Sequence, residues 1–125
     1  MKKLLWIGLA GATGAITRVA IGQVITSDSG FPISTLTVNV IGTFFLCYIL
    51  AGAFRSLSTH KEFQATVTTG FLGSFTTFSA LSMETVILVE QDQFQLAGMY
   101  VIISIFGGIS AGVLGFHLGG KKVSP

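Results

Sequence analysis

Four long apolar stretches dominate the sequence, and short polar connections separate them. The stretches cover residues 4–25, 33–54, 63–89 and 96–118. With His117 counted as neutral, the only charges inside them are Arg18 and Glu84. A helix needs roughly 20 mainly apolar residues to cross the hydrocarbon core of a bilayer, and none of the stretches alternates with the period of a barrel strand. The pattern predicts an all-α membrane protein in which residues 1–125 form one domain of four transmembrane helices.

The composition points the same way. Half of the 125 residues are hydrophobic and 10% are charged, whereas a soluble domain has about 25% charged residues. The basic residues are scattered and form no nucleic-acid patch. No nucleophile with a nearby base and no cluster of metal-binding side chains is visible, so we expect no enzyme. The basic start followed by an apolar run is also typical of a signal peptide, but the run continues to Ile25 and favours a span.

The charges outside the spans divide unequally between the two ends of the bundle. The side with the termini and the middle connection carries six basic residues, and these are Lys2, Lys3, Arg55, Lys61, Lys121 and Lys122. The opposite side carries Asp28, Glu90 and Asp92 and no basic residue. Lys and Arg favour the cytoplasmic face. We therefore expect a multi-pass protein of the bacterial cell membrane with both termini in the cytoplasm.

The third stretch has an unusual centre. Its residues 70–79 read GFLGSFTTFS, with two glycines, two serines and two threonines, which are poor residues for the middle of a helix. We predict that this helix is broken near residues 73–77. A break at membrane depth is tolerated where protein or a cavity satisfies the freed backbone groups, and such breaks bind ions in transporters.

Several polar side chains lie inside the other spans. Thr35, Asn39 and Thr43 recur every fourth residue and so share a helix face, which suits either hydrogen bonds between helices or a polar path. Arg18 is expected to reach the membrane surface, or to pair with a carboxylate or an anion. Glu84 is the only acid in a span. It could ionise, accept a hydrogen bond or end a polar track, and the sequence leaves these alternatives open.

Small residues recur in the first and last spans and predict close helix packing. They are Gly8, Gly11 and Gly14 in one row, and Ser104, Gly108 and Gly112 in the other. The contacts could lie within one chain or between two subunits. Since four helices enclose little volume, a pore would require a second subunit.

The chain resembles the Fluc (CrcB) fluoride channel family over nearly its whole length. The most specific matches are the segment TLTVN, which ends at Asn39, and the segment GFLG…TTFS, which ends at Ser79. The resemblance implies an antiparallel, dual-topology-type dimer with two fluoride pores, which lets fluoride leave the cell. It also implies a structural Na+ at the dimer centre, held by the backbone carbonyls of Gly73 and Thr76 and not transported.

The resemblance further implies roles for individual residues. Asn39 lines the pore, the ring edge of Phe78 contacts fluoride, and Ser79 belongs to a polar track. The other pore residues assigned in this way are Thr77, Leu81, Thr35, Thr43 and Glu84, while Arg18 has a structural role. Aromatic rings carry a positive edge, and Asn and hydroxyl groups donate hydrogen bonds, so these residue types suit a strongly hydrated anion.

Two positions depart from the family pattern, and the charge bias departs from dual topology. Leu81 stands where the family usually has a second pore phenylalanine, and Ser74 stands where a glycine is common. Six basic residues on one side indicate a single orientation in the membrane. We therefore expect an antiparallel heterodimer with an oppositely oriented paralogue, and a homodimer is the alternative.

Two other functions remain as hypotheses at this stage. One is a proton-coupled exporter of the small multidrug type, in which Glu84 would carry the exchange; such exporters have their membrane acid in the first span, which here holds Arg18. The other is an assembly factor that transports nothing.

Overall fold

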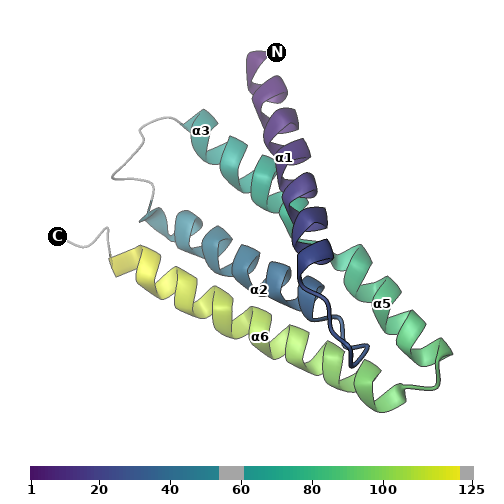
Figure 1. The fold of residues 1–125 in the computed structure, drawn as a ribbon. Coiled ribbons are helices and arrows are strands. Elements are labelled where there is room, and N and C mark those ends of the chain that lie inside the picture. The colour runs from purple at the N-terminus through teal and green to yellow at the C-terminus, as the bar shows by residue number, and fades with distance from the viewer. Residues whose placement is uncertain (54–60, 122–125) are drawn as a thin grey trace.

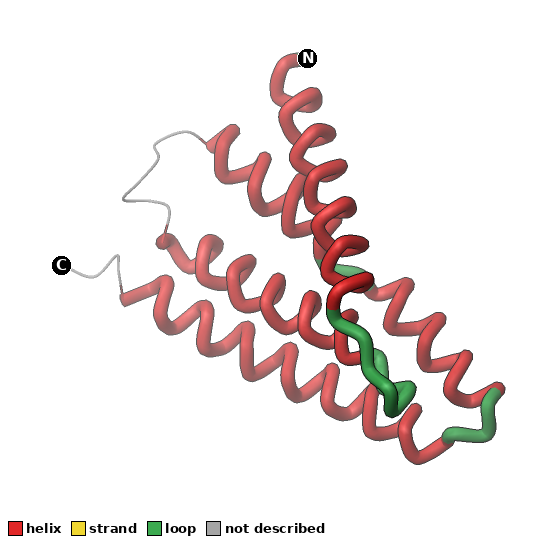
Figure 2. Tube along the Cα trace, viewed as in Figure 1, coloured by secondary structure: helices red, strands yellow, loops and turns green. Residues whose placement is uncertain are grey.

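The computed structural model describes residues 1–53 and 61–121, and within these ranges nearly the whole chain is helical (Figure 2). The elements are α1 (Lys2–Val24), α2 (Ile33–Tyr48), η1 (Ile49–Ala53), α3 (Lys61–Ala65), η2 (Thr66–Leu72), α4 (Gly73–Phe75), α5 (Phe78–Glu90) and α6 (Phe94–Lys121). They combine into four spans that are long and apolar enough to cross a membrane, namely Lys2–Val24, Ile33–Ala53, Lys61–Glu90 and Phe94–Lys121. The predicted all-α protein with four transmembrane helices is confirmed.

The helices begin and end where local chemistry favours it. Pro32 lies just before α2 with φ −76°, and proline suits a helix start because its missing N–H is not needed there. Asp92 adopts a positive φ of 58° between α5 and α6, which aspartate tolerates better than most residues. Gly52 has φ 119° at the end of the second span, where any side chain would be strained. Two of the helical stretches, η1 and η2, are π-helical, which the sequence did not predict.

Two helix pairs build the bundle (Figure 1). Helices α2 and α6 run side by side in opposite directions, and α1 lies against the first half of the third span. Glycines allow both approaches. A Cβ atom on Gly115 or Gly119 would overlap the carbonyl oxygen of Phe44 or Tyr48 in α2, and one on Gly14 would overlap that of Phe71. The backbones therefore touch at these points.

The predicted rows of small residues are used only in part within the chain. A Cβ on Gly11 would lie 3.1 Å from Oγ of Ser74, and one on Gly112 would lie 3.4 Å from Sγ of Cys47. A Cβ on Gly8 or Gly108 would meet nothing within 4 Å. Gly8 and Gly108 are therefore open on the surface of the subunit.

The buried apolar residues form two clusters on either side of the break in the third span. The first contains Val38, Ile49, Leu72 and Phe75. The second contains Leu88, Ala97 and Tyr100, with Phe31, Leu36, Leu81 and Leu96 packed against it. The two halves of the third span thus pack into separate apolar clusters. Polar groups at the break therefore take no apolar residue away from either cluster.

The two ends of the bundle differ in charge as the sequence indicated. Met1, the start of α3 and the end of α6 lie toward one end in Figure 1, and the connections before α2 and before α6 lie toward the other. Arg55 and Lys122 fall outside the described residues. Which end faces the cytoplasm stays a prediction.

Candidate functional site

The third span is broken at two consecutive threonines. Thr76 has φ −78° and ψ 154°, and Thr77 has φ −152° and ψ 123°. Both are extended, so helical hydrogen bonding stops after α4 and resumes in α5, as the loop between the two helices shows in Figure 2. The predicted break near residues 73–77 is confirmed, and it occupies the last two positions of that range.

The side chain of Asn39 closes the break from α2. Its Nδ2 donates to the carbonyl oxygen of Thr77 at 2.9 Å, and its Oδ1 accepts from the Thr77 N–H at 2.8 Å. A carboxamide thus replaces the two partners that a neighbouring backbone would supply. Since buried backbone groups need such partners, Asn39 stabilises the extended conformation of Thr77.

Thr77 also starts the next helix. Its Oγ1 accepts from the N–H of Ala80 at 3.1 Å and lies 3.0 Å from Oγ of Ser79. This is the hydrogen bond of a helix N-cap, a position at which threonine is favoured. On the other side of the break, Oγ1 of Thr76 donates back to the carbonyl of Leu72 at 3.0 Å. The two threonines therefore end one helix and begin the next.

Arg18 reaches the break from α1. Its Nε donates to the carbonyl oxygen of Ser74 at 3.3 Å, close to the end of α4 at Phe75. A cation near the carbonyl end of a helix is electrostatically favourable. The sequence left open whether Arg18 pairs with a carboxylate or an anion or reaches the membrane surface. In the structure its Nε instead contacts a backbone carbonyl, that of Ser74, next to the break.

A carboxylate lies on the other side of the same region. Oε1 of Glu84 accepts from Oγ1 of Thr35 at 2.7 Å, and Oε2 accepts from the hydroxyl of Tyr100 at 2.6 Å. A cavity of about 280 Å³ adjoins these groups. It is lined by Arg18, Val19, Gly22, Ser34, Thr35, Val38, Ala80 and Glu84. Three helices, α1, α2 and α5, therefore meet at a space that Arg18 and the Glu84 carboxylate both line.

Tyr100 is the residue of this site that the sequence interpretation missed. It is completely buried and its ring packs edge-on against Phe31, with the ring centroids 5.5 Å apart. A signal was available, because a buried tyrosine hydroxyl usually has a hydrogen-bond partner and Glu84 is the only acid within the four apolar stretches of the sequence.

The remaining predicted site residues lie in three different surroundings. Phe78 is 79% exposed at the start of α5, and Ser79 is exposed beside it. Leu81 packs against the cluster around Tyr100. Thr43 faces α6, since a Cβ on Gly112 would lie 3.5 Å from its methyl group.

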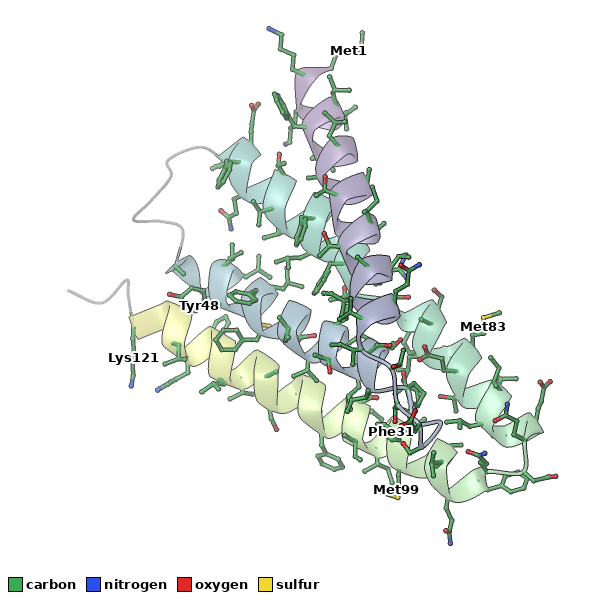
Figure 3. The ribbon with its side chains drawn as sticks, viewed as in Figure 1. Met1, Phe31, Tyr48, Met83, Met99 and Lys121 are labelled. Atoms are coloured by element: carbon green, nitrogen blue, oxygen red, sulfur yellow. The ribbon has the colours of Figure 1, made fainter. Side chains whose placement is uncertain are left out.

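Phe78 and Ser79, the exposed pair at the start of α5, lie on the side of that helix that faces away from the rest of the bundle. Met83, on the same helix, is 68% exposed and extends away from the bundle in Figure 3. Gly73 is likewise exposed. Thr35 and Asn39 therefore contact the third span, whereas Phe78 and Ser79 face outward from the subunit.

Comparisons with known proteins agree on one family. A family model described as CrcB-like protein, Camphor Resistance (CrcB), matches residues 5–116. The "Fluoride-specific ion channel FluC" of Oceanobacillus iheyensis is 39% identical over 94% of this chain and 92% of its own length. The "Fluoride-specific ion channel FluC 1" of Bacillus cereus is 41% identical over 95% and 85%, and "FluC 2" of Geobacillus kaustophilus is 40% identical over 90% and 88%. The chain belongs to the CrcB-like protein family.

Proposed function

We propose that this chain is a subunit of a fluoride-selective channel through which fluoride leaves the cell passively, lowering its cytoplasmic concentration and toxicity. The observation that carries the proposal is the pair of hydrogen bonds between Asn39 and Thr77, which holds a helix break open at membrane depth. The relatives at about 40% identity are named as fluoride-specific ion channels. An ion channel is not an enzyme, and we expect no catalytic activity.

The groups at the break suit an anion path. The hydroxyls of Thr77 and Ser79 lie together, and hydroxyls can replace part of the hydration shell of a small anion. The ring of Phe78 lies next to them in sequence and is exposed. Its positive edge attracts an anion without holding it tightly, which conduction requires.

The outward-facing polar groups point to a second subunit. Ser79 is exposed beside the break. Its hydroxyl lies 3.0 Å from that of Thr77, and this one contact leaves part of its hydrogen-bonding capacity unused, which is costly in lipid unless it is paired or lines a cavity. We propose that a partner in the opposite orientation covers this surface. The basic residues at one end favour an oppositely oriented paralogue over a second copy, with the termini in the cytoplasm.

The end of α4 suits a structural Na+. Carbonyl groups at the C-terminal end of a half-helix coordinate Na+ in other membrane proteins, and Gly73 and Thr76 flank the freed Ser74 carbonyl that Arg18 contacts. Gly73 is exposed, so a cation there would also be accessible to a partner subunit. We propose that the carbonyls of Gly73 and Thr76 hold this ion and that it is not transported.

Fluoride efflux from liposomes tests the proposal. The chain is reconstituted alone and with a candidate paralogue, and released fluoride is followed with a fluoride electrode. We expect flux with the partner, little flux from the chain alone, and no chloride flux. Proteoliposomes that remain impermeable to fluoride in both cases would favour an assembly factor. Exchange of a labelled organic cation dependent on Glu84 would favour the exporter, which the named relatives do not.

A further inference from the structure

A groove lies between α1 and the start of the third span, at the end of the bundle where both helices begin. Its volume is about 440 Å³, and Trp6, Glu62, Phe63 and Thr66 line it. Deeper in the bundle the two helices touch through backbone, because a Cβ on Gly70 would lie 2.7 Å from the carbonyl oxygen of Ile7. Toward their first residues α1 and α3 separate (Figure 1). The groove therefore occupies the space in which the two helices part.

The walls of the groove suit a hydrocarbon chain. Trp6 is 61% exposed and Phe63 is 49% exposed, and tryptophan is enriched where the hydrocarbon meets the headgroups. The hydroxyl of Thr66 donates to the backbone carbonyl of Glu62 at 2.9 Å, so its proton is used within its own helix. Of the described residues that line the groove, Glu62 is the charged one. The groove thus combines two aromatic side chains with a single carboxylate.

Basic side chains surround the mouth of the groove. Lys2 and Lys3 precede Trp6 by four and three positions, which places them on the same face of α1, one turn closer to its start. On the opposite wall α3 begins at Lys61, next to Glu62. All four charged residues are exposed, and lysine side chains reach the headgroup level of a membrane. The first turns of the two helices therefore present ammonium groups and one carboxylate together.

This charge pattern complements a lipid headgroup that carries both signs. A phosphate suits the lysines, and a primary ammonium can donate to the Glu62 carboxylate; such charge-assisted hydrogen bonds are stronger than neutral ones. A choline headgroup has the same charge but no N–H to donate. An anionic headgroup without an amine would meet the lysines but would be repelled by Glu62.

We propose that the groove binds a phospholipid with a primary-amine headgroup, of the phosphatidylethanolamine type. One acyl chain lies between Trp6 and Phe63, the phosphate meets Lys2 and Lys3, and the amine donates to Glu62. The lipid then fills the space between α1 and α3 and links the first turns of the first and third spans. The proposal does not depend on which ion the protein conducts.

Fluorescence of Trp6 tests the proposal, because Trp6 is the single tryptophan of the chain and lines the groove. The protein is reconstituted in phosphatidylcholine with increasing fractions of a lipid whose acyl chains carry bromine, which quenches tryptophan on contact. The brominated lipids are phosphatidylethanolamine, phosphatidylcholine and phosphatidylglycerol. We expect a preference for the ethanolamine lipid over the choline lipid of about two- to fivefold, as for an exposed ion pair.

Two results of this comparison would overturn the proposal. Equal quenching by the ethanolamine and choline lipids would show that the amine is not recognised. Strongest quenching by phosphatidylglycerol would show that the basic end attracts anionic lipid without using Glu62.

A variant tests the assigned carboxylate. In Glu62→Gln the preference for the ethanolamine lipid should disappear, because a neutral amide gives up the charge-assisted bond. Glu90→Gln is the matched control, since Glu90 is an exposed acid at the far end of the same span, and it should keep the preference. A preference of wild-type size in Glu62→Gln would contradict the site.

A headgroup series tests the same bond in the unchanged protein. Ethanolamine lipids with zero, one, two and three N-methyl groups keep their charge but lose one N–H donor at each step. The preference measured by Trp6 quenching should decline along the series. A constant preference would overturn the proposal, and this result does not depend on the folding of any variant.

Discussion

Helix α2 makes two contacts of opposite character. Toward its C-terminal end it meets α6 through backbone, where Gly115 and Gly119 leave room for the carbonyls of Phe44 and Tyr48. Toward its N-terminal end it meets the third span through side chains, where Asn39 holds Thr77 by two hydrogen bonds. The first contact depends on the absence of side chains and the second on one carboxamide.

The contact with α6 holds the folded protein together, whereas the contact with the third span positions the groups of the candidate site. Close backbone packing is the main attraction between helices in lipid, where apolar surface gains little by leaving its surroundings. Hydrogen bonds to a broken helix instead determine where polar groups stand. Substitutions at the two contacts should therefore differ in kind, with loss of folded protein at one and loss of flux from folded protein at the other.

The largest effect is expected at the α2–α6 contact. In Gly115→Val the new side chain would overlap the Phe44 carbonyl, and overpacking of this kind costs about 3 kcal/mol. We expect the variant to lose its monodisperse peak in size-exclusion chromatography in detergent. Gly98→Ala is the control on the same helix, because a Cβ there meets nothing within 4 Å. Equal behaviour of the two variants would show that the close packing is unimportant.

The next effect concerns the break itself. Asn39→Asp keeps an acceptor for the Thr77 N–H but loses the donor to the Thr77 carbonyl, and it places a carboxylate against that oxygen. Breaking this partly buried hydrogen bond leaves the Thr77 carbonyl without its partner at a cost of about 1–3 kcal/mol, so fluoride flux should fall about tenfold or more. Thr37→Val serves as the control, since Thr37 bonds only to Ile33 on its own helix. Flux at the wild-type level would remove Asn39 from the site.

A smaller effect is expected where the site faces outward. Phe78→Ile removes an aromatic edge from a residue that is 79% exposed. Thermal stability should change by no more than about 0.5 kcal/mol, while loss of a ring contact worth about 1 kcal/mol should reduce flux severalfold. Met83→Ile, on the exposed side of the same helix, should alter neither quantity. A marked loss of stability in Phe78→Ile would show that its ring is packed rather than free to meet an ion.

The smallest effect concerns the helix start after the break. Thr77→Val removes the hydroxyl that caps α5 and should destabilise the protein by about 1 kcal/mol, whereas Thr77→Ser keeps the cap. Hydrogen exchange at the Ala80 amide reports on this bond directly. If exchange there is equally slow in both variants, the hydroxyl is not the cap.

The number of helices and the presence of the break could be predicted because both depend on local composition. Long apolar stretches exceed the length of a span wherever they occur, and Gly73, Ser74, Thr76 and Thr77 together weaken a helix without reference to the rest of the chain. The same reasoning could not select the extended residues. That choice depends on Asn39, which lies 38 positions away from Thr77.

The partners of Arg18 and Glu84 could not be predicted from the sequence for a related reason. Several pairings of Arg18 and Glu84 satisfied the same electrostatic rule, and only the path of the chain assigns Ser74 to one and Thr35 with Tyr100 to the other. In α6, apolar residues occur on all sides. Periodicity therefore did not indicate that Gly115 and Gly119, rather than Gly108, face α2.

The contact between Arg18 and Ser74 has a consequence for biogenesis. A chain enters the bilayer in the order of its synthesis, so α1 and α2 are made before the third span. Arg18 and Asn39 are thus already present when Ser74 and Thr77 emerge with backbone groups that lipid cannot satisfy. The first two spans therefore already present hydrogen-bond partners for the broken third span when it is made. A truncated protein beginning at α3 would lack both Arg18 and Asn39.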